Sequence, residues 1–159
     1  VPTCVCHGDA DRRNLQFRDS GTKDEELVAF DWALAGLSVL GDDVHRLIHN
    51  AVNFSKVDQG ELSALARVAY ACYLDGLYDS GWSGDERVVR LGFTAASAMQ
   101  EGIVIMGVLM SRLREPKWIE RYEGFHECRF EEMLVRVLSL FEYQMNLADE
   151  AEKLFEEII

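Results

Sequence analysis

The sequence HGDADRRNL occupies residues 7–15, and FDW follows at residues 30–32. Two β-prone segments connect these motifs, and a polar stretch rich in turn residues lies between the segments. Such an arrangement predicts an antiparallel hairpin with a long loop. The expected strands are 15–18 and 27–30, and the expected loop is 19–24.

The predicted hairpin would bring two oxygen-bearing side chains together. If Leu15 pairs with Phe30, Asn14 lies beside Asp31, because neighbouring strands are ~4.8 Å apart. Two oxygens bound to one Mg²⁺ lie within about 4.2 Å of each other, so side chains at adjacent strand ends can share a cation. The hairpin is therefore expected to bind Mg²⁺ through Asn14 and Asp31.

The order of Asp9, Asn14 and Asp31 along the chain suits phosphoryl transfer. This reaction needs a carboxylate beside the attacking hydroxyl, and oxygen ligands that hold Mg²⁺ against the nucleotide phosphates. Protein kinases place a catalytic Asp, a metal-binding Asn and a second metal-binding Asp in the same order, with the same spacing between the first two. We therefore expect Asp9 to be catalytic, and Asn14 and Asp31 to be metal ligands.

These motifs resemble the C-terminal catalytic lobe of the aminoglycoside phosphotransferase and choline kinase-like family, which has the protein kinase-like fold. The resemblance is strongest over residues 6–47, where HGD, NL, FDWA and LGDDV occur in the family order. It implies an ATP- or GTP-dependent phosphotransferase that uses Mg²⁺ and acts on a small-molecule hydroxyl. It also implies that His7 and Gly8 shape the catalytic loop and that Asp43 hydrogen-bonds back to that loop.

Two features depart from the family pattern. Residues 11–13 are DRR, where many members carry His and a small or Pro-Gly pair. Only six residues precede His7, so the N-terminal nucleotide-binding lobe is missing from this sequence.

The segment 36–41 has P-loop spacing, but Asp42 and Asp43 replace the required Lys and Ser or Thr. We therefore expect a C-terminal lobe that binds nucleotide weakly by itself.

Composition and periodicity predict one α+β domain over residues 1–159. The chain has 159 residues, of which 48% are hydrophobic, which is enough for one core. Residues 1–40 are expected to form a small β-hairpin region with the catalytic loop and the metal-binding hairpin, and residues 41–159 a mainly helical, substrate-side body. Helical spacing of apolar residues is found over 42–52, 58–77, 85–114 and 125–159, with a break expected near Leu147.

The net charge and the cysteines limit the partners and the compartment. A formal net charge of −12 repels phosphate backbones and anionic lipids, so neither nucleic acid nor a membrane is expected, whereas a cationic small molecule would suit it. The longest apolar run, 103–110, is too short to span a bilayer. Four cysteines without a secreted pattern predict the cytoplasm.

Two further patterns have a metal-binding and an ordinary interpretation. Cys4 and Cys6 could bind a soft metal, but their spacing favours buried positions on one face of a strand. His45 and His49 have the spacing of zinc proteases. However, Arg46 stands where the essential Glu would be, so a helix surface with its own hydrogen bonds is favoured.

Several helical residues have two possible environments. Acidic residues could line a pocket for an amine, although most acidic residues on helices face water. A stripe of Met and Ile could line a groove, although core packing is favoured. Trp82 could be a pocket wall or the anchor of a turn. The acidic set is Asp75, Asp79, Glu101, Glu127, Glu131 and Glu132, and the stripe is Met99, Ile103, Met106 and Met110.

Two other functions stay open beside the phosphotransferase. The lobe could be a non-catalytic binding or scaffold module that keeps the loop without its nucleotide-binding partner. A metal-dependent hydrolase would instead use His7, Asp9 and Asp31. The sequence does not predict the substrate-binding residues.

Overall fold

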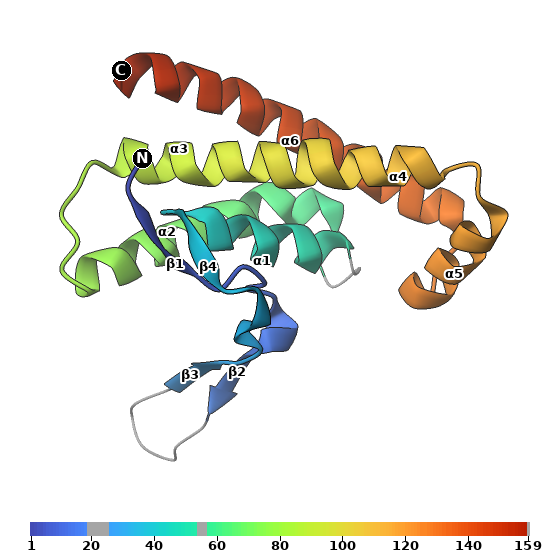
Figure 1. Ribbon diagram of the computed structural model, residues 1–159, viewed down its shortest axis with the longest axis horizontal. Coiled ribbons are helices and arrows are strands. Elements are labelled where there is room, and N and C mark those ends of the chain that lie inside the picture. The colour runs from blue at the N-terminus through green and yellow to red at the C-terminus, as the bar shows by residue number, and fades with distance from the viewer. Residues whose placement is uncertain (19–25, 54–56, 159) are drawn as a thin grey trace.

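The computed structural model describes residues 1–18, 26–53 and 57–158, and the predicted hairpin loop 19–24 lies outside these residues (Figure 1). The strands are β1 Thr3–Cys6, β2 Leu15–Arg18, β3 Glu26–Ala29 and β4 Gly36–Val39. The helices are α1 Asp42–Asn53, α2 Leu62–Asp79, α3 Glu86–Ser97, α4 Met106–Arg112, α5 Pro116–His126 and α6 Phe130–Ile158. Short helical turns are η1 Arg12–Asn14, η2 Trp32–Leu34 and η3 Gln59–Glu61, and a π-helical segment, η4, spans Ala98–Ile105.

The fold is α+β and mostly helical, as the sequence predicts, and it contains two separate two-stranded sheets. In one sheet β1 pairs with β4, and in the other β2 pairs with β3, both antiparallel. The β2–β3 hairpin projects away from the helical body, whereas β1 and β4 lie beside α1 (Figure 1). The predicted catalytic loop joins the two sheets, because it lies between β1 and β2.

The predicted hairpin is present, but its predicted register is wrong by one residue. Leu15 pairs with Ala29, not with Phe30. The ladder continues beyond the strands, since the Phe30 amide donates to the Asn14 carbonyl over 3.0 Å.

Strand β4 is absent from the sequence prediction. Its Leu37 is 80% exposed, so the segment lacks the half-buried alternation that indicates a strand.

The core lies where α1 meets α2, α3 and α6. Val44, Ile48 and Val52 follow one another at i, i+4 spacing on α1 and are buried. They form one cluster with Phe93 of α3 and with residues of the other two helices. Each such side chain contributes roughly 1.5–3 kcal/mol when fully buried. These contacts anchor α1, whose first turn begins directly after the sheet of β1 and β4.

Helices α3 and α4 and the segment η4 form one long helical rod over Glu86–Arg112 (Figure 1). By length and composition this rod could cross a membrane, with a mean hydropathy of 1.4 over its most apolar window. No membrane-spanning helix was expected from the sequence, so this finding differs from that prediction. Core helices of water-soluble proteins pass the same test; this rod packs against α1 and α6, and 35% of its most apolar window is buried.

The sequence predicts a last helix over 125–159 with a break near Leu147. Both the predicted start and the predicted break are wrong. Two helices occupy this region, because α5 begins with Pro116, a favoured first helical residue, and ends at His126. Glu127 then takes a left-handed conformation with φ of 52° and reverses the chain before α6. Helix α6 runs without a break past Leu147, which is buried in the core.

The stripe of Met and Ile residues does not pack in the core as predicted. Met99, Ile103 and Met110 are all at least 60% exposed, and only Met106 is half-buried. In this half of the rod Leu109 is buried against the rest of the body, whereas Val104 and Val108 are also exposed. Trp82 is half-buried and stacks on Tyr78 with ring centroids 5.7 Å apart, which favours the interpretation as a turn anchor.

The packing of α3 against the end of β4 can be tested at Gly92 of α3. A Cβ at this position would lie 2.1 Å from the Leu40 carbonyl oxygen, so α3 approaches the end of β4 through backbone contact. We expect Gly92→Ala to lower the free energy of unfolding by about 1–3 kcal/mol in urea denaturation. Gly76→Ala is the matched control, because nothing lies within 4 Å of its Cβ position on α2. This control should be neutral or stabilising by up to ~1 kcal/mol, and equal effects of the two changes would contradict the packing.

Candidate catalytic loop and buried carboxyl cluster

The start of the loop after β1 is fixed to the helical body by the carboxylate of Asp43. Asp43, in the first turn of α1, accepts hydrogen bonds from the backbone amides of His7 and Gly8, at 2.8 and 2.9 Å. This is the contact that the family resemblance implies. Hydrogen bonds to an ionised carboxylate are roughly twice as strong as those between neutral groups. Asp43 therefore sets the position at which the predicted catalytic loop begins.

His7 links this loop to the end of the β2–β3 hairpin. The Asp9 amide donates to His7 Nδ1 over 3.3 Å, so Nδ1 is the unprotonated nitrogen. Nε2 then carries the proton and donates to the Phe30 carbonyl over 2.9 Å. The ring is buried and lies 4.6 Å from the Trp32 ring, centroid to centroid. Because both nitrogens are engaged within the protein, His7 does not have a lone pair available for the metal of a hydrolase.

Gly8 is required by the close approach of two backbones. It has φ of +75°, which side-chain-bearing residues rarely adopt. A Cβ on it would also lie 2.3 Å from the carbonyl oxygen of Leu34 in η2. The predicted loop-shaping role of Gly8 therefore has a steric basis, since the loop packs directly on the turn that follows the hairpin.

Asp9 and Asn14 lie together, as their predicted roles require. Asn14 Nδ2 donates to both the backbone carbonyl and the Oδ2 atom of Asp9, each over 3.0 Å. The backbone between them is a tight turn, because the Asp11 amide donates to the Asp9 carbonyl and the Asn14 amide donates to the Asp11 carbonyl. Because the Asn14 side-chain nitrogen donates to Asp9, the side-chain oxygen is the atom of this amide that could bind a cation.

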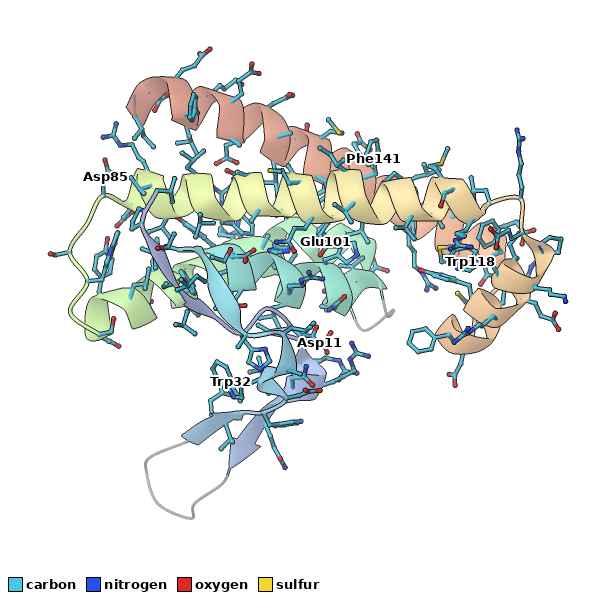
Figure 2. All side chains as sticks on the ribbon, in the orientation of Figure 1. Asp11, Trp32, Asp85, Glu101, Trp118 and Phe141 are labelled. Carbon is cyan, nitrogen blue, oxygen red and sulfur yellow. The ribbon has the colours of Figure 1, made fainter. Side chains whose placement is uncertain are left out.

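Asp11 anchors the middle of the loop, a role that the sequence analysis did not assign to residues 11–13. Its side chain is 1% exposed and accepts hydrogen bonds from the backbone and Nε of Arg13 at 2.8 Å. Asn50 of α1 also bonds to it. Burial opposes ionisation of Asp11, but these hydrogen bonds and the Arg13 charge outweigh burial and lower its pKa. Figure 2 shows Asp11 next to α1, between the loop and the helical body.

Asp31 lies at the same end of the hairpin as Asn14. It follows Phe30, which is paired with Asn14, and it is exposed in a left-handed conformation with φ of 62°. Within the described ranges, no group of three His, Cys, Asp or Glu side chains is close enough to hold a metal ion. Mg²⁺ in nucleotide sites is commonly held by one or two carboxylates together with phosphate oxygens and water. The Asn14 amide and the Asp31 carboxylate are oxygen donors of the type such a site uses, but Phe30, and not Asp31 as predicted, lies opposite Asn14.

The surroundings of Cys4 and Cys6 in β1 favour their interpretation as side chains on one face of a strand, and not as metal ligands. Cys6 is 3% exposed, and its thiol faces Cys4 at 3.5 Å between the two sulfur atoms. Burial, together with the Cys4 contact and nearby carboxylates, raises the pKa of Cys6 to about 12. A soft metal binds the thiolate form, so Cys6 is a small buried side chain of the strand.

His45 and His49 are buried, and the predicted helix surface is wrong. Their exposed fractions are 2% and 8%, because the rod of α3 and η4 covers this side of α1. Glu101 of η4 lies opposite them, with Oε1 at 3.5 Å from His45 Nε2 and Oε2 at 3.2 Å from His49 Nε2. Arg46 approaches the same carboxyl at 3.6 Å. Of the six acidic residues singled out in the sequence, Glu101 is buried and the other five are exposed.

Burial disfavours the charged forms of Glu101, His45 and His49. Burial raises the pKa of Glu101 to about 7, against the opposing effect of Arg46. It lowers the pKa of His49 to about 4 and also lowers that of His45. His45 Nδ1 donates to the Asp42 carbonyl, so a neutral His45 presents an unprotonated Nε2 to Glu101. A protonated Glu101 matches this acceptor, which agrees with the raised pKa of the carboxyl.

Comparison of the chain with protein-family models, with curated proteins and with solved structures gives no match. The functional interpretation therefore depends on the geometry of the loop and of the cavities around it.

The Asp43 contact leads to a stability prediction. Asp43→Ala would leave the amides of His7 and Gly8 without their acceptor, and we expect a loss of about 2–4 kcal/mol in urea denaturation. Asp43→Asn keeps one carbonyl oxygen and should lose less. Amide exchange of His7 and Gly8, measured by NMR, should accelerate most in the Ala variant. An Ala variant as stable as the wild type would show that Asp43 does not hold the loop.

The buried carboxyl leads to a pH prediction. Since the pKa of Glu101 rises from 4.5 to about 7 on folding, its contribution to stability is present below pH 4.5 and is lost as the pH rises through 7. Glu101→Gln removes this titration. Between pH 5 and 8, the wild type should therefore lose ~1–3 kcal/mol of unfolding free energy relative to Glu101→Gln. Parallel pH profiles of the two proteins would contradict the raised pKa.

Proposed function

We propose that this domain is the C-terminal lobe of a small-molecule kinase, a phosphotransferase that moves the terminal phosphoryl group of ATP or GTP to a hydroxyl. The observation that carries the proposal is the hydrogen-bonded pair of Asp9 and Asn14, in a loop that Asp43 clamps and beside which Asp31 emerges. A solvated acidic turn needs none of these contacts. A phosphoryl-transfer loop needs all of them, because its effect depends on positioning.

Each side chain then has a defined task. Asp9 accepts or orients the proton of the acceptor hydroxyl, and general-base assistance of this kind contributes roughly 10²–10⁴-fold to the rate. The Asn14 amide oxygen and the Asp31 carboxylate would hold Mg²⁺, which supplies charge neutralisation for the nucleotide phosphates. Asn14 also holds Asp9 in one orientation through its amide nitrogen. His7 and Gly8 act as positioning residues that fix the loop between β1 and the hairpin.

The surface of the strands supports the presence of a second lobe. Val5 of β1 and Leu37 of β4 are directly paired across the sheet and are 70% and 80% exposed. Other large apolar side chains of the strand region are also exposed. Exposed apolar side chains paired across a sheet suit a contact with another protein unit. We propose that the nucleotide-binding lobe packs against the sheet of β1 and β4; the other exposed apolar residues of the strand region are Leu27, Phe30, Trp32 and Leu34.

Asp9→Asn tests the proposed chemistry with little change of shape. The Asn retains an oxygen that can accept from Asn14, but it cannot take a proton from the acceptor hydroxyl. In the protein carrying its nucleotide-binding lobe, we expect kcat to fall by ~10²–10⁴-fold while the affinity for nucleotide changes less than about threefold. Phosphate transfer would be measured with ATP and GTP against aminoglycosides, choline, amino alcohols and sugars. Asp149→Asn, at an exposed position of α6, is the matched control.

Two results would contradict this function. Equal losses of transfer and of nucleotide affinity in Asp9→Asn would make Asp9 a structural residue. Nucleotide binding without transfer to any acceptor would instead favour the non-catalytic binding module.

A further inference from the structure

A cavity of about 270 Å³ lies between α1, η4, α4, α5 and α6. Its wall is mostly apolar and includes the aromatic rings of Trp118, Tyr122 and Phe141. Trp118 and Tyr122 contact each other with their ring planes tilted and centroids 4.7 Å apart, so the two rings form one aromatic surface. Figure 2 labels Trp118, Phe141 and Glu101, which belong to three of the elements around the cavity. A cavity of ~150 Å³ is large enough for benzene, so this one has room for a ring and a short side chain.

The floor of this cavity is polar and mostly buried. It consists of Arg46, His49 and Glu101 together with the amides of Asn50 and Gln144. Gln144 is 3% exposed and accepts a hydrogen bond from Ser97 Oγ over 2.6 Å, which fixes its orientation. His49 is 92% buried, and its Nδ1 has no hydrogen-bond partner among the described residues. Buried polar atoms without partners are rare in folded proteins, and apolar walls with a few convergent polar groups are typical of ligand sites.

The charges on the floor favour an anion over a cation. Arg46 is permanently charged, and one of its amino groups already bonds to Gln100 over 2.7 Å. Glu101 cancels only part of this charge near pH 7, since burial raises its pKa to about 7. His49, with a pKa of about 4, is neutral there. An amine would also meet repulsion from Arg46, which lies 3.6 Å from the only carboxylate on the floor.

We propose that this cavity binds a small carboxylic acid with an apolar body of one ring, whose carboxylate pairs with Arg46 and whose ring packs against Trp118 and Phe141. The inference goes beyond the proposed phosphotransferase activity and does not depend on it. It also differs from the cationic ligand that the net charge of −12 suggests, because the local charge at a buried site, not the total, determines which group can be buried there.

Three ligands with one carbon skeleton and different end groups test this assignment. They are 3-phenylpropanoate, 3-phenylpropan-1-ol and 3-phenylpropylamine, titrated at pH 7 into the 159-residue chain by calorimetry and by quenching of Trp118 emission. Because a hydrogen-bonded charge pair typically changes affinity by tenfold or more, we expect the carboxylate to bind at least ~10-fold more tightly than the amine. Trp118→Phe identifies the part of the emission change that comes from the cavity.

Two variants locate the charge that binds the carboxylate. Arg46→Met keeps most of the side-chain length and should weaken 3-phenylpropanoate binding at least ~10-fold. Arg112→Met makes the same change at an exposed arginine outside the cavity and should leave binding unchanged. If Arg46→Met fails to fold by circular dichroism, the three ligands on the wild type still decide. Tighter binding of the amine, or no saturable binding of any of the three, would overturn the proposal.

Discussion

The arrangement of this domain depends on the carboxylate of Asp43, which accepts two backbone amides from a segment that lies 35 to 36 residues earlier in the chain. The strands are short and their sheets have two strands each, so neither sheet could hold the loop in place by itself. The carboxylate transfers the rigidity of α1, which is buried in the core, to the loop with Asp9. In this way the helical body fixes the position of a loop that belongs to the strand region.

Local pattern was sufficient to predict much of this framework. The hairpin, the strand Thr3–Cys6 and the amphipathic α1 follow from residue types and spacing, whereas the Asp43 contact was expected only from the family resemblance. The pairing register does not, because turn residues indicate where a hairpin bends but do not fix which residues face each other. Strand β4 gives a weak signal because its Gly36 and Leu37 are both exposed, so the segment lacks a half-buried alternation. The reversal at Glu127 was missed because it uses a left-handed non-glycine residue.

The buried carboxyl cluster could not be predicted from spacing alone, because Glu101 meets His45 and His49 across more than fifty positions of sequence. One signal was available in the sequence. His45 and His49 each follow a core residue of α1, namely Val44 and Ile48, so they border the buried stripe of that helix. Histidines beside such a stripe are expected to be covered by a neighbouring helix. Which residue of that helix covers them depends on tertiary packing, which spacing does not reveal.

The π-helical segment η4 changes the phase of the long rod. A π turn contains more residues than an α turn, so the residues after it are rotated about the helix axis relative to those before it. Val89, Phe93 and Ser97 are buried at intervals of four, but Val104 and Val108 are exposed. Glu101 lies inside the wider turns and is among the buried residues there. The rod thus turns one face toward the core in its first half and a different one in its second, and a uniform helical wheel drawn over its whole length would assign solvent-facing valines to the interior.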